Sequence, residues 1–498
     1  MLRRLQSSEL FVVGIAFVAC IVSRLLSTVY YIEDIDSLRF ALSIIDYDVA
    51  KLQPHFPAYP VFCFVAKVLY FVMRRYALAF SLIGGLSTFL IIFFTLKIAN
   101  ITVSTILGKL TVFVIFMTPL LWLMGNRYMP DVMGVACLLA SLYFVTAQAE
   151  NRKNAFLCSC SIGFFLTGIL IGIRISYLPM LIPALLIATI INKNRIKFII
   201  VGVIGILIWL IPLIFITGWG PLINAAQTQS HGHFSDFGGT ISTTPDLWLR
   251  ISKIFESLFA DGLGLYWNGR HLLTLCTTII LFGIVIVSFR KTVRQRVVES
   301  LSTEKPIYLN PIFLGCVVYF VWIFLAQNVI YKSRHVLPLL PFIALGIAYS
   351  CYRIITIQGV YMFNNRWLHR IRLPFVWGII SLFFLCYSFV TLITIVQHTR
   401  PTAIAQMHEY LQDKRIEQEN KLHIVSVPLI TYYLSSQALD ANYIPVKSEE
   451  DLHQLNEIDT GIIAIGSSLS NREPIEIKTF YHNPYVNRMW SELSLFEY

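Results

Sequence analysis

The chain has 498 residues, of which 56% are hydrophobic and 13% charged, and its mean hydropathy is +0.68. This composition, with repeated apolar runs of about 20 residues, predicts a polytopic helical membrane protein and excludes an ordinary soluble enzyme. The net charge is +11, but the basic residues lie between apolar segments rather than on one exposed face, so we exclude nucleic acid as a partner.

The charge divides unevenly along the chain. After His398 there are 8 Lys and Arg against 14 Asp and Glu, so this tail carries −6 and the remainder +17. Under the positive-inside rule, a basic membrane part with an acidic tail predicts that the tail lies on the non-cytoplasmic side.

Eleven membrane spans are expected. The first apolar run resembles a signal peptide without a small-residue cleavage site, so we expect a retained helix at Glu9–Tyr30. The run Val61–Met73 is short, contains Lys67 and ends at two arginines, which favours a place in the membrane interface. The remaining spans are expected at 77–98, 104–124, 131–149, 155–173, 177–191, 196–217, 270–290, 310–329, 336–356 and 373–396.

Loop charges support this count. With the N-terminus inside, the cytoplasmic connections are 97–109, 150–154, 192–197, 290–309 and 353–372, and each contains at least two basic residues. If Val61–Met73 crossed the membrane, all these clusters would lie outside, against the positive-inside rule. We therefore expect an integral membrane protein with a cytoplasmic N-terminus and a non-cytoplasmic C-terminal domain.

Two domains are expected. Residues 1–398 form a transmembrane module with an acidic first outer loop, 32–60, and a long outer loop, 218–269, which carries a short helix near 246–259. Residues 399–498 alternate a charged helix, Ala403–Gln418, with strands at Leu422–Val427 and Gly461–Gly466. This alternation predicts a small soluble α/β domain.

The first outer loop concentrates acidic residues, and its reading stays open. A short amphipathic helix is expected at Ser37–Ile45, with Asp36 or Ser37 as its N-cap. Asp34 and Asp36 are two positions apart, so in an extended segment they point the same way, which suits one divalent cation or one orienting group plus one base. The alternative is a helix cap with solvated acids around it.

Other residues expected on the same face indicate which chemistry the carboxylates serve. Inverting glycosyl transfer needs a carboxylate that takes the proton of the acceptor hydroxyl. Basic residues expected on the same face suit a phosphate that leaves with a lipid, because charge develops on it in the transition state. The outer-face residues are Arg127, Asp131, Arg174, Lys332, Arg334 and His335. Asp131 lies four positions after Arg127, and His335 directly follows Arg334.

Two stretches resemble a known family. Residues 36–41 read DSLRFA and residues 53–60 read QPHFPAYP, which is similar to the first outer loop of the GT-C membrane glycosyltransferases. The resemblance is to glycosyltransferase family 39, the protein O-mannosyltransferases and the aminoarabinose transferases. Residues 334–341, RHVLPLLP, resemble the late Arg-Tyr-x-x-Pro-x-x-Pro run of that family, with His335 in place of tyrosine. The resemblance covers residues 1 to about 400.

The resemblance implies an all-α polytopic membrane fold of GT-C type, with about 11 transmembrane helices, juxtamembrane helices and a small C-terminal α/β domain. It implies an inverting hexosyl or pentosyl transferase, with a polyprenyl-phosphate sugar as donor, Asp36 as base, and the lipid phosphate on Arg127, Arg174 and Arg334. The acceptor is a glycan, a lipid or a protein, and membrane lipids surround the enzyme.

The roles of three residues stay open under this reading. Asp34 binds a divalent cation (Mg²⁺ or Mn²⁺), the sugar or neither, and His55 and Tyr59 lie in the proline-aromatic run as acceptor-groove candidates.

One alternative function is a transporter or flippase for lipid-linked polysaccharide, which predicts ionisable residues in mid-span. Another is an O-antigen-type ligase or polymerase, which places its chemistry in the loop 218–269.

Overall fold

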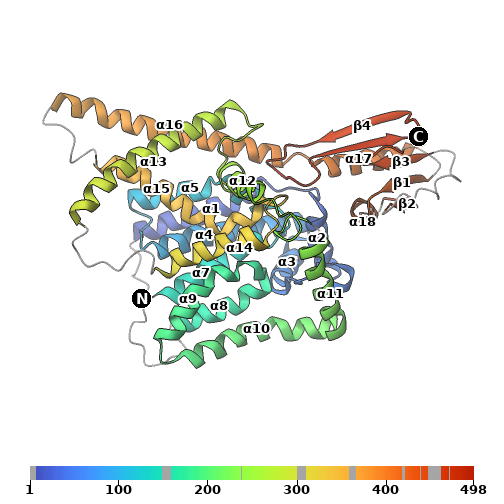
Figure 1. The fold of residues 1–498 in the computed structure, drawn as a ribbon, viewed down its shortest axis with the longest axis horizontal. Coiled ribbons are helices and arrows are strands. Elements are labelled where there is room, and N and C mark those ends of the chain that lie inside the picture. Colours follow the sequence, from blue (N-terminus) through green and yellow to red (C-terminus); the bar gives the residue numbers. More distant parts are fainter. Residues whose placement is uncertain are drawn as a thin grey trace.

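The computed structural model describes residues 7–147, 159–236, 238–299, 310–357, 366–417, 421–437, 439–446, 461–469 and 472–498. The predicted basic connection 150–154 lies outside the described residues, as do parts of 290–309 and 353–372. Helices form most of the molecule, and a small sheet projects beyond one end of them (Figure 1).

The helices before the tail follow the predicted segments closely. They are α1 (Ser7–Leu26), α2 (Ile35–Ile45), α3 (Pro60–Met73), α4 (Tyr76–Ile98), α5 (Ile106–Phe116), α6 (Pro119–Asn126), α7 (Asp131–Thr146), α8 (Ser159–Arg174), α9 (Leu178–Ile191), α10 (Arg195–Thr217), α11 (Trp219–His231), α12 (Leu247–Phe255), α13 (Leu272–Glu299), α14 (Pro311–Ala326), α15 (Leu340–Ile357) and α16 (Arg366–His398).

Eleven of these positions match the predicted spans. In the described chain, seven helices are long and apolar enough to cross a membrane, and the bent pair α5 and α6 makes an eighth. That count takes Ser159–Ile191 as one stretch, although the turn Ile175–Tyr177 separates α8 from α9. The helices α7 and α14 are apolar but only 16 residues long. The predicted architecture is confirmed, and the place of α3 relative to the membrane stays a prediction.

The segment predicted as one span at 104–124 is two helices. The axes of α5 and α6 differ by 54°. Pro119 opens α6 and has no N–H to continue the ladder of α5, so the helix breaks there. Thr118 precedes it, and its hydroxyl donates to the carbonyl of Val114 at 2.7 Å instead.

The long outer loop contains more helix than expected. Besides α12, which was predicted, α11 and two π-helical turns, Gly232–Asp236 and Glu256–Gly262, lie in this region. The N-cap of α12 is Asp246, whose carboxylate accepts from the N–H of Leu249 at 3.0 Å. The second π-helical turn adjoins the candidate site.

The tail is a five-stranded sheet with two helices. Its elements are α17 (Ala403–Glu417), β1 (Leu422–Ser426), α18 (Pro428–Ser435), β2 (Ala441–Pro445), β3 (Ile462–Ile465), β4 (Glu476–Tyr481) and β5 (Glu492–Glu497). The strand order is β2-β1-β3-β5-β4, with β2, β1 and β3 parallel and the β3–β5 and β5–β4 pairs antiparallel. The predicted helix and two strands are confirmed, and β2, β4 and β5 were missed.

The tail and the first outer loop share one hydrophobic core. Leu38 of α2, Met407 of α17 and Leu495 of β5 belong to the same buried cluster. The hydroxyl of Tyr433 in α18 donates to the carbonyl of Ile32 at 2.6 Å. This packing holds the tail against the start of α2, where the acidic residues lie (Figure 1).

Candidate functional site

Asp34 and Asp36 lie at the start of α2 but have different roles. Asp34 is the N-cap, since its Oδ1 accepts a 2.8 Å hydrogen bond from the N–H of Ser37. The expectation that Asp36 or Ser37 caps the helix is therefore wrong, because both lie inside it. Asp36 is in the first helical turn rather than in an extended segment, so the assumed side-by-side arrangement of the two carboxylates is also wrong.

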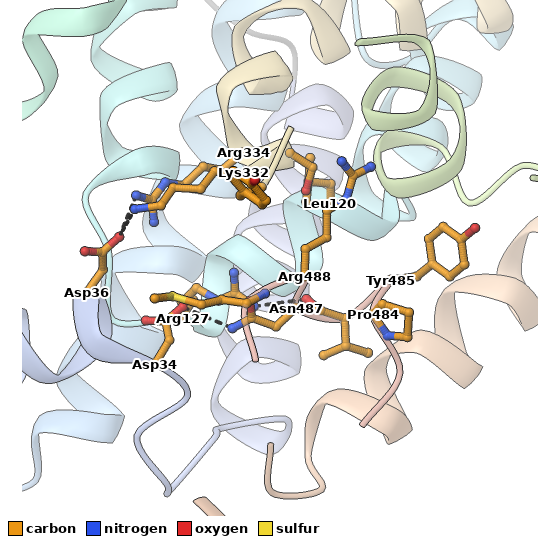
Figure 2. Close-up of a pocket in the computed structure, with 14 residues that line it drawn as sticks. Asp34, Asp36, Leu120, Arg127, Lys332, Arg334, Pro484, Tyr485, Asn487 and Arg488 are labelled. Atoms are coloured by element: carbon orange, nitrogen blue, oxygen red, sulfur yellow. Dashed lines mark hydrogen bonds and ion pairs between the residues drawn. The ribbon is translucent and has the colours of Figure 1, made fainter. Parts of the chain in front are cut away.

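Asp36 is a buried carboxylate with two cationic partners. Its side chain is almost fully buried, and its Oδ2 accepts hydrogen bonds from Lys332 Nζ at 2.7 Å and Arg334 Nη2 at 2.8 Å. Figure 2 shows these two side chains reaching Asp36 from the other wall of the site. The Nη1 of Arg39 lies 3.9 Å from the second carboxylate oxygen. The positive charges outnumber the negative one, which suits an anionic ligand.

The cations control the protonation of Asp36. Burial disfavours its charged form, but Lys332 and Arg334 outweigh burial and hold the pKa of Asp36 well below its usual range. Burial also lowers the pKa of Lys332, although Asp36 opposes that shift. Asp36 is therefore ionised at neutral pH. It becomes a stronger base when another anion takes its two partners, because the two largest effects that oppose burial are then withdrawn.

Lys332 and Arg334 come from the segment after α14. The N–H of Lys332 donates to the carbonyl of Asn328 at 3.2 Å, which closes a turn. The side-chain nitrogen of Asn328 donates to the carbonyl of Gly238 at 3.0 Å, so the turn is tied to the long outer loop. The Nη1 of Arg334 lies 2.7 Å from the sulfur of Met129.

The cavity beside Asp36 is built from four distant parts of the chain. Its empty space is about 410 Å³, including the part open to solvent. It is lined by Asp34, Asp36, Leu120, Arg127, Tyr331, Lys332, Ser333, Arg334, Pro484, Tyr485, Val486, Asn487, Arg488 and Met489. Figure 2 shows the tail residues lying opposite Asp34 and Asp36. The first loop, the helix α6 with its C-cap Arg127, the segment after α14 and the tail thus meet here.

Arg127 lines the cavity and is also held by a buried acid. Its Nε lies 2.5 Å from Glu33 Oε2, and the other oxygen of Glu33 bonds His398 at the end of α16. Although burial alone would raise the pKa of Glu33, Arg127 and His398 lower it to about 2. The Nη2 of Arg127 donates to the carbonyl of Val486 at 3.0 Å. This contact joins the second outer loop to the tail.

A second polar cluster lies behind Asp36, outside the cavity lining. Arg174 Nη2 pairs with Asp131 Oδ1 at 3.0 Å, and both side chains are buried. Arg174 Nη1 also donates to the hydroxyl of Tyr59 at 3.3 Å, and that hydroxyl lies 3.3 Å from Nε2 of His55. Burial lowers the pKa of His55 to about 3, so its ring is neutral. The roles of these four residues in substrate binding stay predictions.

The remaining predicted residue is His335, which follows Arg334 in a 3-10 turn, Ser333–Leu339. Its ring is buried, and its Nδ1 has no hydrogen-bond partner among the described residues. Its carbonyl accepts from the hydroxyl of Tyr319 at 2.9 Å. The structure therefore brings Asp34, Asp36, Arg127, Lys332 and Arg334 to the cavity and places the other predicted residues behind it.

The contribution of the tail was missed. Asn487 and Arg488 line the cavity from the loop between β4 and β5, and Asn487 Nδ2 donates to Asp34 Oδ2 at 3.0 Å. The sequence around them, NPYVNRMW, has proline and asparagine of a turn, but no pattern in it indicates a contact with the first loop.

The side chains present do not fit a divalent cation at the two acids. Asp34 uses one oxygen for the helix cap and the other for Asn487, and Asp36 holds two cations that would repel a metal ion. In the part of the chain that the structure describes, no three His, Cys, Asp or Glu side chains are grouped to hold a metal. We therefore derive no step through a metal.

Comparison with known proteins gives a likeness in structure. No protein-family model matches the chain, and no curated protein matches its sequence. The oligosaccharyltransferase of Archaeoglobus fulgidus, solved with a tethered acceptor peptide, matches over 93% of this chain and 69% of its own length, with a TM-score of 0.51 and 11% identity. ArnT from Cupriavidus metallidurans in the apo state matches over 97% of both chains, with a TM-score of 0.50 and 10% identity. The chain has the GT-C fold.

The GT-C fold confirms the architecture of membrane helices that the resemblance implied, and the five-stranded sheet confirms the small C-terminal α/β domain that the pattern of the tail predicted. At 10 and 11% identity the likeness shows the fold alone, so the activity has to be argued from the site. A structure of the same ArnT bound to undecaprenyl phosphate aligns with a TM-score of 0.49.

Proposed function

We propose that the chain is an inverting glycosyltransferase that moves a sugar from a polyprenyl-phosphate donor to an acceptor on the non-cytoplasmic face of a bacterial plasma membrane. The observation that carries this proposal is the buried Asp36, paired with Lys332 and Arg334 at a cavity of a GT-C fold. These three residues supply a base and two phosphate-binding cations within one site.

In the proposed reaction Lys332 and Arg334 bind the donor phosphate in place of Asp36. The donor phosphate takes Lys332 and Arg334 from Asp36, so the charge that holds the carboxylate in its ionised form is withdrawn. Asp36 then accepts the proton of the acceptor hydroxyl while the oxygen of that hydroxyl attacks the anomeric carbon. The bond from that carbon to the phosphate oxygen breaks, and the lipid phosphate keeps the electron pair. The two cations stabilise its charge.

The fold relatives support the two substrates of this reaction. ArnT from C. metallidurans has been solved with undecaprenyl phosphate, and the A. fulgidus oligosaccharyltransferase with an acceptor peptide. Undecaprenyl phosphate is a lipid phosphate, and the peptide is an acceptor. The identity of the sugar, hexose or pentose, and the class of acceptor in this chain are for the assay to decide.

Asp36→Asn tests the base. We expect it to lower sugar transfer by at least about 100-fold, since general-base catalysis contributes about 10²–10⁴ in rate. Donor binding should persist, because Lys332 and Arg334 remain available. The measurement is transfer in membranes supplied with radiolabelled polyprenyl-phosphate sugars, at matched expression.

Asp46→Asn is the matched control. Asp46 belongs to the same acidic loop, but its side chain is 58% exposed and pairs with Lys51 on the surface. The Asp46→Asn variant should transfer sugar at the rate of the wild type. If Asp36→Asn also transfers like the wild type, the base is wrong and a transporter or ligase explains the chain better.

A further inference from the structure

The loop between β4 and β5 touches every wall of the cavity with three consecutive residues. The carbonyl of Val486 accepts from Arg127, and Asn487 donates to Asp34, the cap of α2. Arg488 faces the segment that carries Lys332. The helix of Asp36 and the turn of Lys332 are thus both in contact with the same short piece of tail (Figure 2).

Arg488 joins three segments through one guanidinium group. Its Nη1 lies 3.4 Å from the carbonyl of Val329 and 3.2 Å from that of Ile330, just before Lys332. Its Nη2 lies 2.6 Å from Asp261 Oδ2 and 3.4 Å from Glu256 Oε1, both in the π-helical turn of the outer loop. A planar guanidinium with five donors can serve carbonyls and carboxylates together, which an ammonium group cannot do as well.

The loop itself is held firmly by the tail. His482 Nδ1 accepts from the N–H of Ala403 at 2.9 Å, so its Nε2 carries the proton that it donates to the carbonyl of Asn487 at 2.8 Å. Burial lowers the pKa of His482, which keeps this neutral form. The hydroxyl of Tyr485 donates to the carbonyl of Asn268 at 2.5 Å. The start of α17 and the outer loop therefore fix where Arg488 lies.

We propose that the tail segment Val486–Arg488 is a positioning element of the site, and that Arg488, held by Asp261, sets the place of Lys332. The inference rests on the proposed function for its effect on transfer. Lys332 extends from the turn whose carbonyls Arg488 binds, and it must reach both Asp36 and the donor phosphate. A displacement of about 1 Å in such a group costs about 100-fold in rate.

The test compares Arg488→Gln, Asp261→Asn and the double variant in the full-length protein. We expect each single change to lower kcat/KM by about 10- to 100-fold, mainly through a higher KM for the donor, with the acceptor KM unchanged. The double variant should lose no more than the worse single variant, because the two residues act through one contact. Lys421→Gln, which breaks an exposed ion pair of the tail with Asp440, is the control and should leave transfer unchanged.

A second measurement reports on position without sugar transfer. Tyr331 is 56% exposed and adjoins Lys332, so Tyr331→Cys can be labelled with a membrane-impermeant maleimide, with the parent chain as background. Adding Arg488→Gln should raise the labelling rate several-fold, and Arg488→Lys, which keeps the charge, should give an intermediate rate. If Arg488→Gln does not fold, the labelling rate of Arg488→Lys against the wild type gives the same test.

The outcomes are distinct. Wild-type labelling and transfer in Arg488→Gln would overturn the positioning role, as would single effects that multiply in the double variant. If the wild type transfers sugar from none of the donors while the labelling still responds to Arg488, the positioning stands and the proposed function fails.

Discussion

The chemistry of single residues here depends on how carboxylates are paired. Asp36 has two cationic partners and a pKa well below its usual range. Asp261, the partner of Arg488, has a pKa that burial raises to about 6, although Arg488 and Arg270 oppose this. One carboxylate is thus kept charged and the other is poised to change its charge near neutral pH.

A pH dependence follows for Asp261, which faces Arg488, Arg270, Glu256 and Ser333. Its folded-state pKa of about 6 lies above its ordinary value of 3.8, so folding stability falls as pH rises between these two values, and in the folded protein the neutral form prevails below about pH 6. Since the neutral form cannot pair with Arg488, kcat/KM should fall on the acid side with an apparent pKa near 6.

The pH–rate profiles of the wild type and Asp261→Asn check this. The variant should be slow throughout and lack the acid limb. A limb near pH 6 that persists in the variant would assign it to another group.

At the scale of elements, the start of α2 determines the direction of Asp36. The helix begins at Ile35 because Asp34 caps it, and the same Asp34 receives Asn487 from the tail. Moving the cap by one residue would rotate Asp36 by about 100° around the helix axis, away from Lys332. The cap is therefore part of the site without touching a reacting atom.

Substitutions at Asp34 separate capping from catalysis. Asn is an equally good N-cap, but its amide nitrogen cannot accept the hydrogen bond that Asp34 Oδ2 takes from Asn487, so Asp34→Asn should keep the fold and lower transfer only several-fold. Asp34→Ala should lower the free energy of unfolding by about 1 kcal/mol. Thermal unfolding in detergent and the transfer assay measure the two effects. A folded Asp34→Asn protein without transfer would instead make Asp34 a catalytic carboxylate.

At the scale of the whole molecule, the tail and the membrane helices form one working unit. The tail shares a buried core with the first outer loop and supplies six of the residues that line the cavity. Because the cavity cannot lie across the membrane from its own lining, the first loop, the segment after α14 and the tail must all be on one side.

The predicted eleven spans, an odd number, would place the two termini on opposite sides of the membrane. We expect a C-terminal epitope tag to be reached by antibody in cells with a permeable outer envelope and an intact plasma membrane, and an N-terminal tag only after that membrane is opened. The charge pattern predicts this orientation. Both tags reached from the same side would mean an even number of spans, with α3 the first segment to reconsider.

Helices and strands of strong pattern could be read from the sequence because their signal is local. Long apolar runs predicted eleven helical positions, and the motif residues Asp36, Lys332 and Arg334 were expected on one face before the structure joined them. The strands β2, β4 and β5 were missed, since each has only five or six residues and the stability of so short a strand depends on the neighbouring strands that it packs against.

Composition, hydropathy and charge by themselves determined the membrane class, the segment positions and the acidic loop, because burial in lipid demands long apolar runs. Only the tertiary structure decided the partners. Whether Asp34 caps a helix or holds a ligand, and whether Arg127 is committed to Glu33, depends on which groups arrive from elsewhere. Arg488 lies 154 residues after Arg334 in the sequence, yet both line the same cavity. Ion pairs and hydrogen bonds of a site act over a few ångströms, and sequence separation carries no information about such distances.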